Sequence, residues 1–106
     1  KDTNTGDGQS GRNVSVVDGQ QIIAVKAKGG YSPRTTTAKA NIPTVIKMST
    51  QGTFDCSASL TIPSLDFREN LPASGMTPIS VPPQKSGTLL RGLCSMGMYH
   101  FVIKFQ

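Results

Sequence analysis

The sequence predicts an all-β domain, an antiparallel sandwich or barrel. Short runs rich in β-branched and small apolar residues alternate with turn residues along most of the chain. Seven prolines and eleven glycines separate these runs, and no segment shows the long 3.6-residue period of an amphipathic helix. The 106 residues are enough for one domain with a modest core.

The first twelve residues, KDTNTGDGQSGR, have no apolar periodicity. Such a segment buries too little surface to offset the entropy of ordering its backbone. We therefore expect a flexible linker over residues 1–12 and a folded domain over residues 13–106. The chain begins with Lys1 rather than methionine, and no apolar run approaches the ~20 residues of a membrane-spanning helix. We expect a soluble piece of a longer chain, whose missing start is a leader or an anchor.

Five strands are expected before the last one. Residues 20–28 (QQIIAVKAK) follow the turn pair Asp18-Gly19. Residues 44–50 follow Pro43, which suits the start of a strand but not its middle. The others are expected over residues 57–62, 77–81 and 87–93, with one short helical turn around residues 64–71.

The last strand, YHFVIKFQ, carries the clearest period-two pattern. It places Tyr99, Phe101, Ile103 and Phe105 on one face. His100, the only histidine of the chain, falls on the other face, and we expect it to be exposed. Met48 is expected in the core.

Three sulfur side chains lie within five residues in the segment CSMGMYH, from Cys94 to Met98. The segment joins two expected strands, so it should form a loop, and Gly97 would let that loop turn tightly. An isolated methionine usually fills a gap in a core. Met96 and Met98 fit that role poorly because loops lie at the surface. Cys56 could approach Cys94 if their strands are neighbours.

Two thiolates and two thioethers form a soft donor set, which favours Cu(I), whereas Zn(II) would be expected to recruit more thiolates or imidazoles. A blue-copper site needs a cysteine and two histidines, and His100 supplies only one. A disulfide between Cys56 and Cys94 is the alternative, and it would contribute about 4 kcal/mol by the chain-entropy model. From the residues alone, a disulfide and a free thiol pair both remain open.

The net charge of +5 comes from scattered basic residues. They form no basic stripe with interleaved aromatics, so we expect no nucleic-acid binding. Preference for an acidic partner remains an alternative to a merely solvated surface. No catalytic constellation stands out, and we expect a protein that is not an enzyme.

Several motifs together resemble a known family. GGYSP, GTFDCS, LPASGMTPISVPP and above all CSMGMYH resemble the cupredoxin-like domains of bacterial copper-handling proteins, over residues 29–106. The resemblance extends to the membrane-anchored Cu(I) chaperone of streptococcal copper-export systems. It also extends to the related metal-binding domain of Cu(I)-exporting P-type ATPases.

This resemblance implies a Greek-key β-sandwich that binds two Cu(I) ions at neighbouring sites. Cys56 and Cys94 would form the tighter site, and Met96 and Met98 the weaker one. In blue-copper relatives a histidine stands where Cys56 would align, and the replacement shifts the site from redox chemistry toward Cu(I) storage and transfer. His100 is assigned no ligand role, because family members often have glycine after this histidine and this chain has Phe101.

The expected function is a monomeric Cu(I) chaperone that passes copper to the metal-binding domain of a Cu(I)-exporting P-type ATPase. Free ligand cysteines favour a reducing compartment. We therefore expect the domain to face the cytoplasm, attached to the cell membrane only through an N-terminal anchor. The alternatives are a type 1 copper electron carrier and a disulfide-stapled interaction module.

Overall fold

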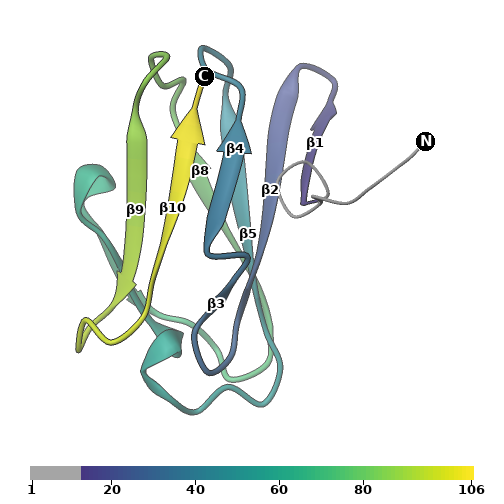
Figure 1. The fold of residues 1–106 in the computed structure, drawn as a ribbon. Helices are drawn as coiled ribbons and strands as arrows, with labels where there is room; N and C mark the ends of the chain where they lie inside the picture. Colours follow the sequence, from purple (N-terminus) through teal and green to yellow (C-terminus); the bar gives the residue numbers. More distant parts are fainter. Residues whose placement is uncertain (1–12) are drawn as a thin grey trace.

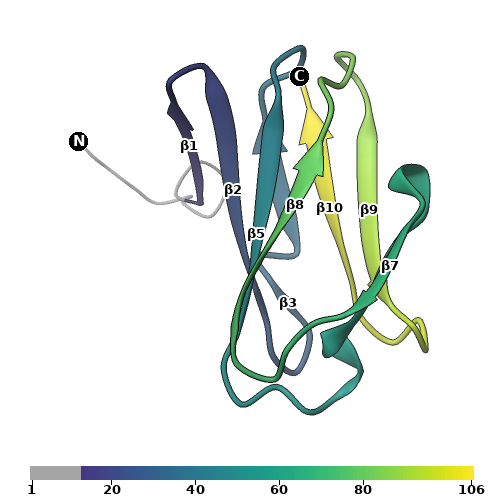
Figure 2. The same ribbon diagram turned by 180° about the vertical axis from the view of Figure 1, so that it is seen from behind.

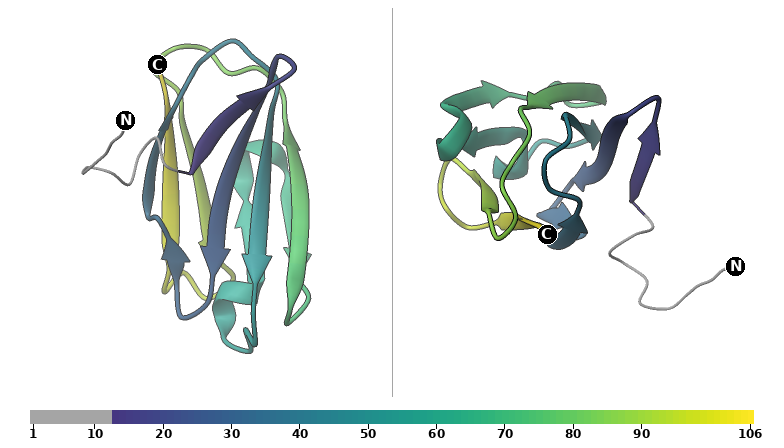
Figure 3. Two further views of the ribbon diagram at one scale, coloured as in Figure 1. Left: turned by 90° about the vertical axis from the view of Figure 1, so that its right-hand side faces the viewer. Right: turned by 90° about the horizontal axis from the view of Figure 1, so that it is seen from above.

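Strands dominate the structure, a computed structural model that describes residues 13–106. They form two five-stranded sheets that pack face to face (Figures 1 and 3). The predicted all-β sandwich is confirmed. The linker expected over residues 1–12 lies outside the described residues.

The first sheet has the order β1-β2-β5-β8, with β3 paired to the end of β2. Its strand β2 alternates buried and exposed residues along its length, because one face packs on the core. The bounds are β1 (Val14–Val17), β2 (Gln20–Ala27), β3 (Tyr31–Ser32), β5 (Thr44–Thr50) and β8 (Gly75–Val81).

The second sheet has the order β4-β10-β9-β6-β7. Its central strands β9 and β10 form an antiparallel hairpin around the loop of residues 95–99. The bounds are β4 (Thr35–Ala38), β6 (Ser59–Ile62), β7 (Phe67–Asn70), β9 (Leu89–Cys94) and β10 (His100–Phe105).

Both sheets are mixed, which differs from the antiparallel arrangement that we expected. β2 pairs with β5 in parallel, and β4 pairs with β10 in parallel. After β2 and β3, the chain crosses to the second sheet for β4 and returns to the first for β5. The return brings β5 beside β2 in the same direction, whereas a hairpin connection would have reversed it.

The region expected to form one helical turn contains two elements. A short 3₁₀ turn, η2 (Pro63–Leu65), ends at Asp66, whose φ of 54° is left-handed. The chain then extends as β7, so the helical turn expected over residues 64–71 is wrong for its second half. A second 3₁₀ turn, η1 (Cys56–Ala58), delays the start of β6 to Ser59.

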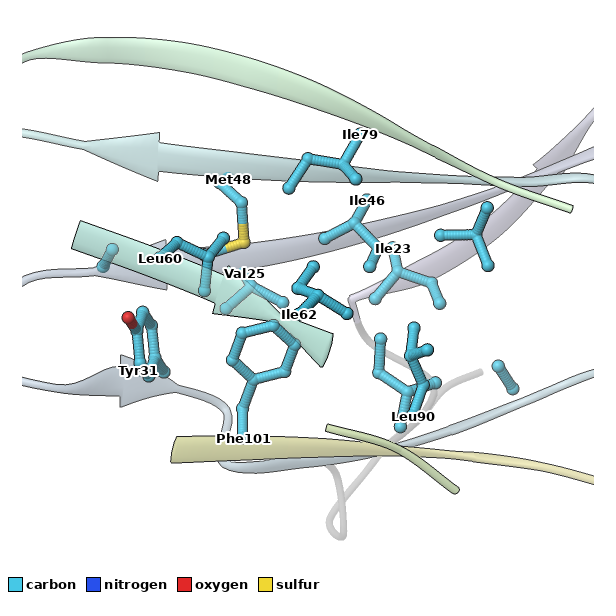
Figure 4. Close-up of a cluster of buried hydrophobic side chains, with 14 of the residues drawn as sticks. Ile23, Val25, Tyr31, Ile46, Met48, Leu60, Ile62, Ile79, Leu90 and Phe101 are labelled. Carbon is cyan, nitrogen blue, oxygen red and sulfur yellow. The ribbon is translucent and has the colours of Figure 1, made fainter. Parts of the chain in front are cut away.

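Apolar side chains from both sheets form one core (Figure 4). Met48 is fully buried there, as predicted. Phe101, Ile103 and Phe105 are buried while His100 is exposed, which confirms the predicted alternation from His100 onward. Tyr99, predicted on the same face, lies just before β10 and is half-buried against the core. Tyr31 lies at one end of the core, with its ring edge-to-face on Phe101 at 5.1 Å between centroids.

Four connections gather at one end of the sandwich, the lower end in Figures 1 and 2. They are β2–β3, β5–β6 with η1, β7–β8, and β9–β10. Backbone hydrogen bonds join them: Thr53 N donates to Ala73 O at 2.9 Å, and Ser95 N donates to Ser59 O at 2.9 Å. This end presents the candidate site.

Within residues 13–106, no helix is long and apolar enough to cross a membrane.

Candidate metal centre

Cys94 is the last residue of β9 and is fully buried. The loop that follows closes tightly on it. Cys94 N donates to Tyr99 O at 3.0 Å, and Gly97 N donates to Cys94 O at 2.9 Å. Gly97 has a φ of +73°, a left-handed conformation that glycine adopts without steric cost. The sequence-predicted loop between Cys94 and the last strand is therefore present.

Cys56 begins η1 and is half-buried. Strand β6, which follows η1, pairs with β9 so that Leu60 stands opposite Cys94. The strands of the two cysteines are thus neighbours, as the predicted approach of Cys56 to Cys94 required. Both cysteines are free, and Cys56 Sγ donates a hydrogen bond to Cys94 Sγ at 2.7 Å. Residues 38 positions apart in the chain form one thiol pair.

The two thiols differ in acidity because one donates this hydrogen bond and the other accepts it. The bond to Cys94, together with burial, raises the pKa of Cys56 to about 11. Burial also opposes ionisation of Cys94. Its sulfur, however, accepts hydrogen bonds from the Cys56 thiol and from the backbone N–H groups of Tyr99, Met96 and Met98, and these lower the pKa of Cys94. Cys94 therefore becomes the thiolate first, with its charge held by the loop amides.

A buried tyrosine contacts η1 from the core side. Tyr31 Oη donates to Ser57 O at 3.0 Å, and both residues are buried. Burial, with the nearby negative charge of the cysteines, raises the pKa of Tyr31, so its hydroxyl remains a hydrogen-bond donor at neutral pH. Tyr31 thus ties the turn that carries Cys56 to the core residue Phe101, on which its ring packs.

Asp55 holds the start of η1. Its carboxylate accepts a hydrogen bond from Ser57 Oγ at 2.6 Å. That bond, with the backbone N–H of Gly29, lowers the pKa of Asp55. The charged carboxylate therefore links the Cys56 turn to the β2–β3 connection. Asp55 and Tyr31 hold η1 from two sides.

The two loop methionines point outward. The exposed fractions are 73% for Met96 and 63% for Met98. Phe54, just before the Cys56 turn, is 86% exposed. The structure thus places thiols inside and thioethers outside at the same end of the domain. His100 is exposed on the outward face of β10.

The candidate metal ligands at this end of the domain are sulfur atoms. Within residues 13–106, no group of three or more His, Cys, Asp and Glu side chains could hold a metal ion. Two thiols in contact, followed by two exposed thioethers, form a soft donor set of the kind that suits Cu(I). Metal binding requires both thiols to lose their protons, which also removes the hydrogen bond between them.

Sequence reasoning missed the residues that support the thiols. Tyr31 belongs to the motif GGYSP but was assigned no role, and nothing in the sequence around Asp55 indicates its hydrogen bond to Ser57. The hydroxyl of Tyr31 reaches a backbone carbonyl 26 positions away. No local pattern reports such a contact. The glycine pair of the β2–β3 turn, Gly29 and Gly30, was a local signal that the backbone turns closely past neighbouring side chains, since both residues have positive φ.

The sequence matches a known family. The model of the cupredoxin-like domain family matches residues 10–104. A search of curated proteins gives no match.

Two solved structures share the fold at a TM-score of 0.78 and 22% sequence identity, each covering 88% of this chain. One is the solution structure of a copper-binding protein in the apo form, of which 94% is covered. The other is the metal-binding domain of the Streptococcus pneumoniae Cu(I)-exporting P-type ATPase CopA with Cu(I), of which 92% is covered. The chain belongs to the cupredoxin-like domain family.

Proposed function

We propose that this domain binds Cu(I) and passes it to the metal-binding domain of a Cu(I)-exporting P-type ATPase. The observation that carries the proposal is the contact of the Cys56 and Cys94 sulfurs at 2.7 Å, with both cysteines free. Membership of the cupredoxin-like family supports it. So does the likeness in fold to a domain that was solved with Cu(I).

The thiol pair is the tighter of two neighbouring Cu(I) sites in this proposal. Thiolates bind Cu(I) more strongly than neutral thioethers do, because they add charge to softness. Cys94 loses its proton more readily, since the loop amides hold its negative charge. Cys56 keeps its proton until the metal displaces it.

Met96 and Met98 form the weaker site, where Cu(I) enters and leaves. Their thioethers are exposed and need no deprotonation, so they can take up metal at any physiological pH. Cu(I) accepts two or three sulfur ligands, so a thiolate of the partner can bind before a ligand of this domain dissociates. Transfer then needs no free copper ion.

The likeness in fold to an ATPase domain supports the proposed partner. One domain of this fold belongs to a Cu(I)-exporting P-type ATPase, and two related domains that offer the same ligands can exchange metal with little change in free energy. The net charge of +5 would favour docking to a partner surface of opposite sign. A monomer that faces the cytoplasm and is held at the membrane by an N-terminal anchor completes the proposal, since reducing conditions keep the thiols free.

Two other functions fit less well. A type 1 copper electron carrier needs two histidine ligands, and the chain has His100 alone. A disulfide-stapled interaction module would have paired cysteines, and titration of the native protein with a thiol reagent separates this case. Two reactive thiols exclude the staple.

Native mass spectrometry with Cu(I) under anaerobic conditions tests the proposal. We expect two bound copper ions in the unmodified domain. Cys56→Ser or Cys94→Ser should leave at most one weakly bound copper, because each removes a thiolate from the tighter site. Ser95→Ala is the matched control: Ser95 lies between Cys94 and Met96, and its replacement removes no sulfur. Two copper ions retained by both cysteine variants would rule out the thiol pair as a copper site.

A further inference from the structure

A recess of about 340 Å³ lies beside the methionine loop. The β2–β3 turn and the residues around β3 form one side of it, and the end of the β9–β10 loop forms the other. The side chains that matter here are Lys28, Ser32, Arg34, Met98, Tyr99 and His100. Its volume is in the range of sites for small molecules, which begin at roughly 300 Å³.

Close packing of a glycine on an aromatic ring shapes the recess. Gly30 has a φ of +120°, and a Cβ atom there would lie 3.4 Å from Cδ1 of Tyr99. The β2–β3 turn therefore lies directly against the Tyr99 ring. This contact holds the recess next to Met98, the residue before Tyr99.

The recess is positively charged. Arg34 and Lys28 line it, and none of its lining residues carries a carboxylate. One carboxylate lies close by, that of Asp55, whose Oδ2 is 3.9 Å from the position of a Cβ atom on Gly29. The Ser57 hydroxyl and the Gly29 N–H already hydrogen-bond that carboxylate. The recess therefore favours an anion.

Arg34 is the better placed of the two cations. The ammonium of Lys28 lies toward Gly52, 3.9 Å from the position of a Cβ atom there, so it stands at the margin of the recess. A guanidinium binds a carboxylate through two parallel hydrogen bonds. Ser32 adds a hydroxyl group to the same lining. A carboxylate is thus the anion that this lining suits best.

We propose that the recess binds the carboxylate of a small anionic thiol that delivers Cu(I) to Met98. This inference rests on the proposed function. A molecule that holds Cu(I) in a reducing compartment must offer a soft thiolate. A carboxylate anchored at Arg34 would place the copper-bearing sulfur beside the exposed thioether of Met98. The small volume of this half-open recess favours a small carrier over a segment of a protein partner.

The exchange balances without electron transfer. The bond between Cu(I) and the sulfur of the carrier breaks, and a bond between Cu(I) and a cysteine sulfur of the domain forms, with Met98 as the intermediate donor. The proton that the cysteine thiol gives up goes to the sulfur of the carrier, which leaves as a thiol. Copper stays monovalent throughout.

Binding of the anion is tested without metal. S-methylglutathione, which has carboxylates but no free thiol, is titrated into the metal-free protein while backbone amide shifts are followed by NMR. We expect shifts confined to residues 28–34 and 98–100, and at least a threefold weaker binding in Arg34→Gln. Arg91→Gln is the matched control, because Arg91 is exposed on β9 outside the recess. No shifts, or equal weakening in both variants, would overturn the proposal.

Delivery is tested by the rate of Cu(I) uptake from two donors. Arg34→Gln should slow uptake from the Cu(I)–glutathione complex three- to tenfold and leave uptake from Cu(I)–acetonitrile, which has no carboxylate, unchanged. Equal rates for Arg34→Gln and Arg91→Gln from glutathione would refute delivery through the recess. Failure of both donors to load the unmodified protein would instead refute the proposed function, and the NMR titration would still decide whether the recess binds the anion.

Discussion

The hydroxyl of Tyr31 donates a hydrogen bond to the carbonyl oxygen of Ser57 at 3.0 Å. Ser57 follows Cys56 in the η1 turn, and the Tyr31 ring packs on Phe101 in the core. The position of one copper-ligand candidate therefore depends on a contact with a residue of β3, which belongs to the other sheet from the strand that follows η1. We predict from this relationship that Tyr31 positions the thiol pair.

Tyr31→Phe should lower the free energy of unfolding by about 1–3 kcal/mol, because it leaves a buried carbonyl without a partner. It should also weaken the tighter copper site, since η1 is less firmly held. Urea unfolding and competition with a Cu(I) chelator measure the two effects. Tyr99→Phe is the control, because within residues 13–106 the Tyr99 hydroxyl makes no hydrogen bond. A loss of stability with unchanged copper affinity would show a purely structural role for Tyr31.

Gly92→Ala should destabilise the domain by about 1–3 kcal/mol, the usual cost of overpacking a core. Gly92 stands opposite Phe101 in the β9–β10 hairpin, and a Cβ atom there would lie 2.4 Å from the Phe101 ring. Thermal unfolding measures the change. The double variant with Phe101→Leu should lose less than the sum of the two single losses, because the smaller side chain makes room. Additive losses of unfolding free energy would show that the strain in Gly92→Ala does not come from contact with the Phe101 ring.

The apparent Cu(I) affinity should rise with pH. The pKa of Cys56 is raised to about 11, so near neutral pH its thiol is protonated and copper binding must release that proton. The proton released by Cys56 increases the apparent affinity about tenfold per pH unit, and any proton that Cys94 still holds adds to this dependence. Competition with a Cu(I) chelator from pH 6 to 8, corrected for the protonation of the chelator, checks this. An affinity independent of pH would exclude Cys56 as a ligand.

The loop methionines should affect copper binding but not stability. Met96→Ala and Met98→Ala should each lose only the weaker copper, with unfolding free energies within about 0.5 kcal/mol of the unmodified protein, because both side chains are exposed. Met48→Ala should cost about 2–5 kcal/mol, since Met48 is fully buried. Native mass spectrometry and urea unfolding measure the two properties.

Met76→Ala is the control for the loop methionines. Met76 is 51% exposed on β8, outside the loop of residues 95–99. We expect it to leave both copper ions in place. Two copper ions bound to the double variant Met96→Ala/Met98→Ala would rule out both loop methionines as ligands.

The local pattern of the sequence determined the last strand and the loop before it. Alternation along residues 99–105 predicts which side chains are buried, because successive residues of a strand point to opposite faces. The same reasoning placed Met96 and Met98 in a connection, and both are exposed there. Their ligand roles, and those of Cys56 and Cys94, stay predictions.

Tertiary structure decided which residues and strands that are distant in the sequence lie next to one another. The contact of Cys56 with Cys94 depends on the pairing of β6 with β9, which places Leu60 opposite Cys94. The parallel pairing of β2 with β5 and the bond from Tyr31 to Ser57 depend likewise on how the two sheets assemble. Periodicity along a chain reports which face of a strand is buried, but it carries no information about which distant strand covers that face.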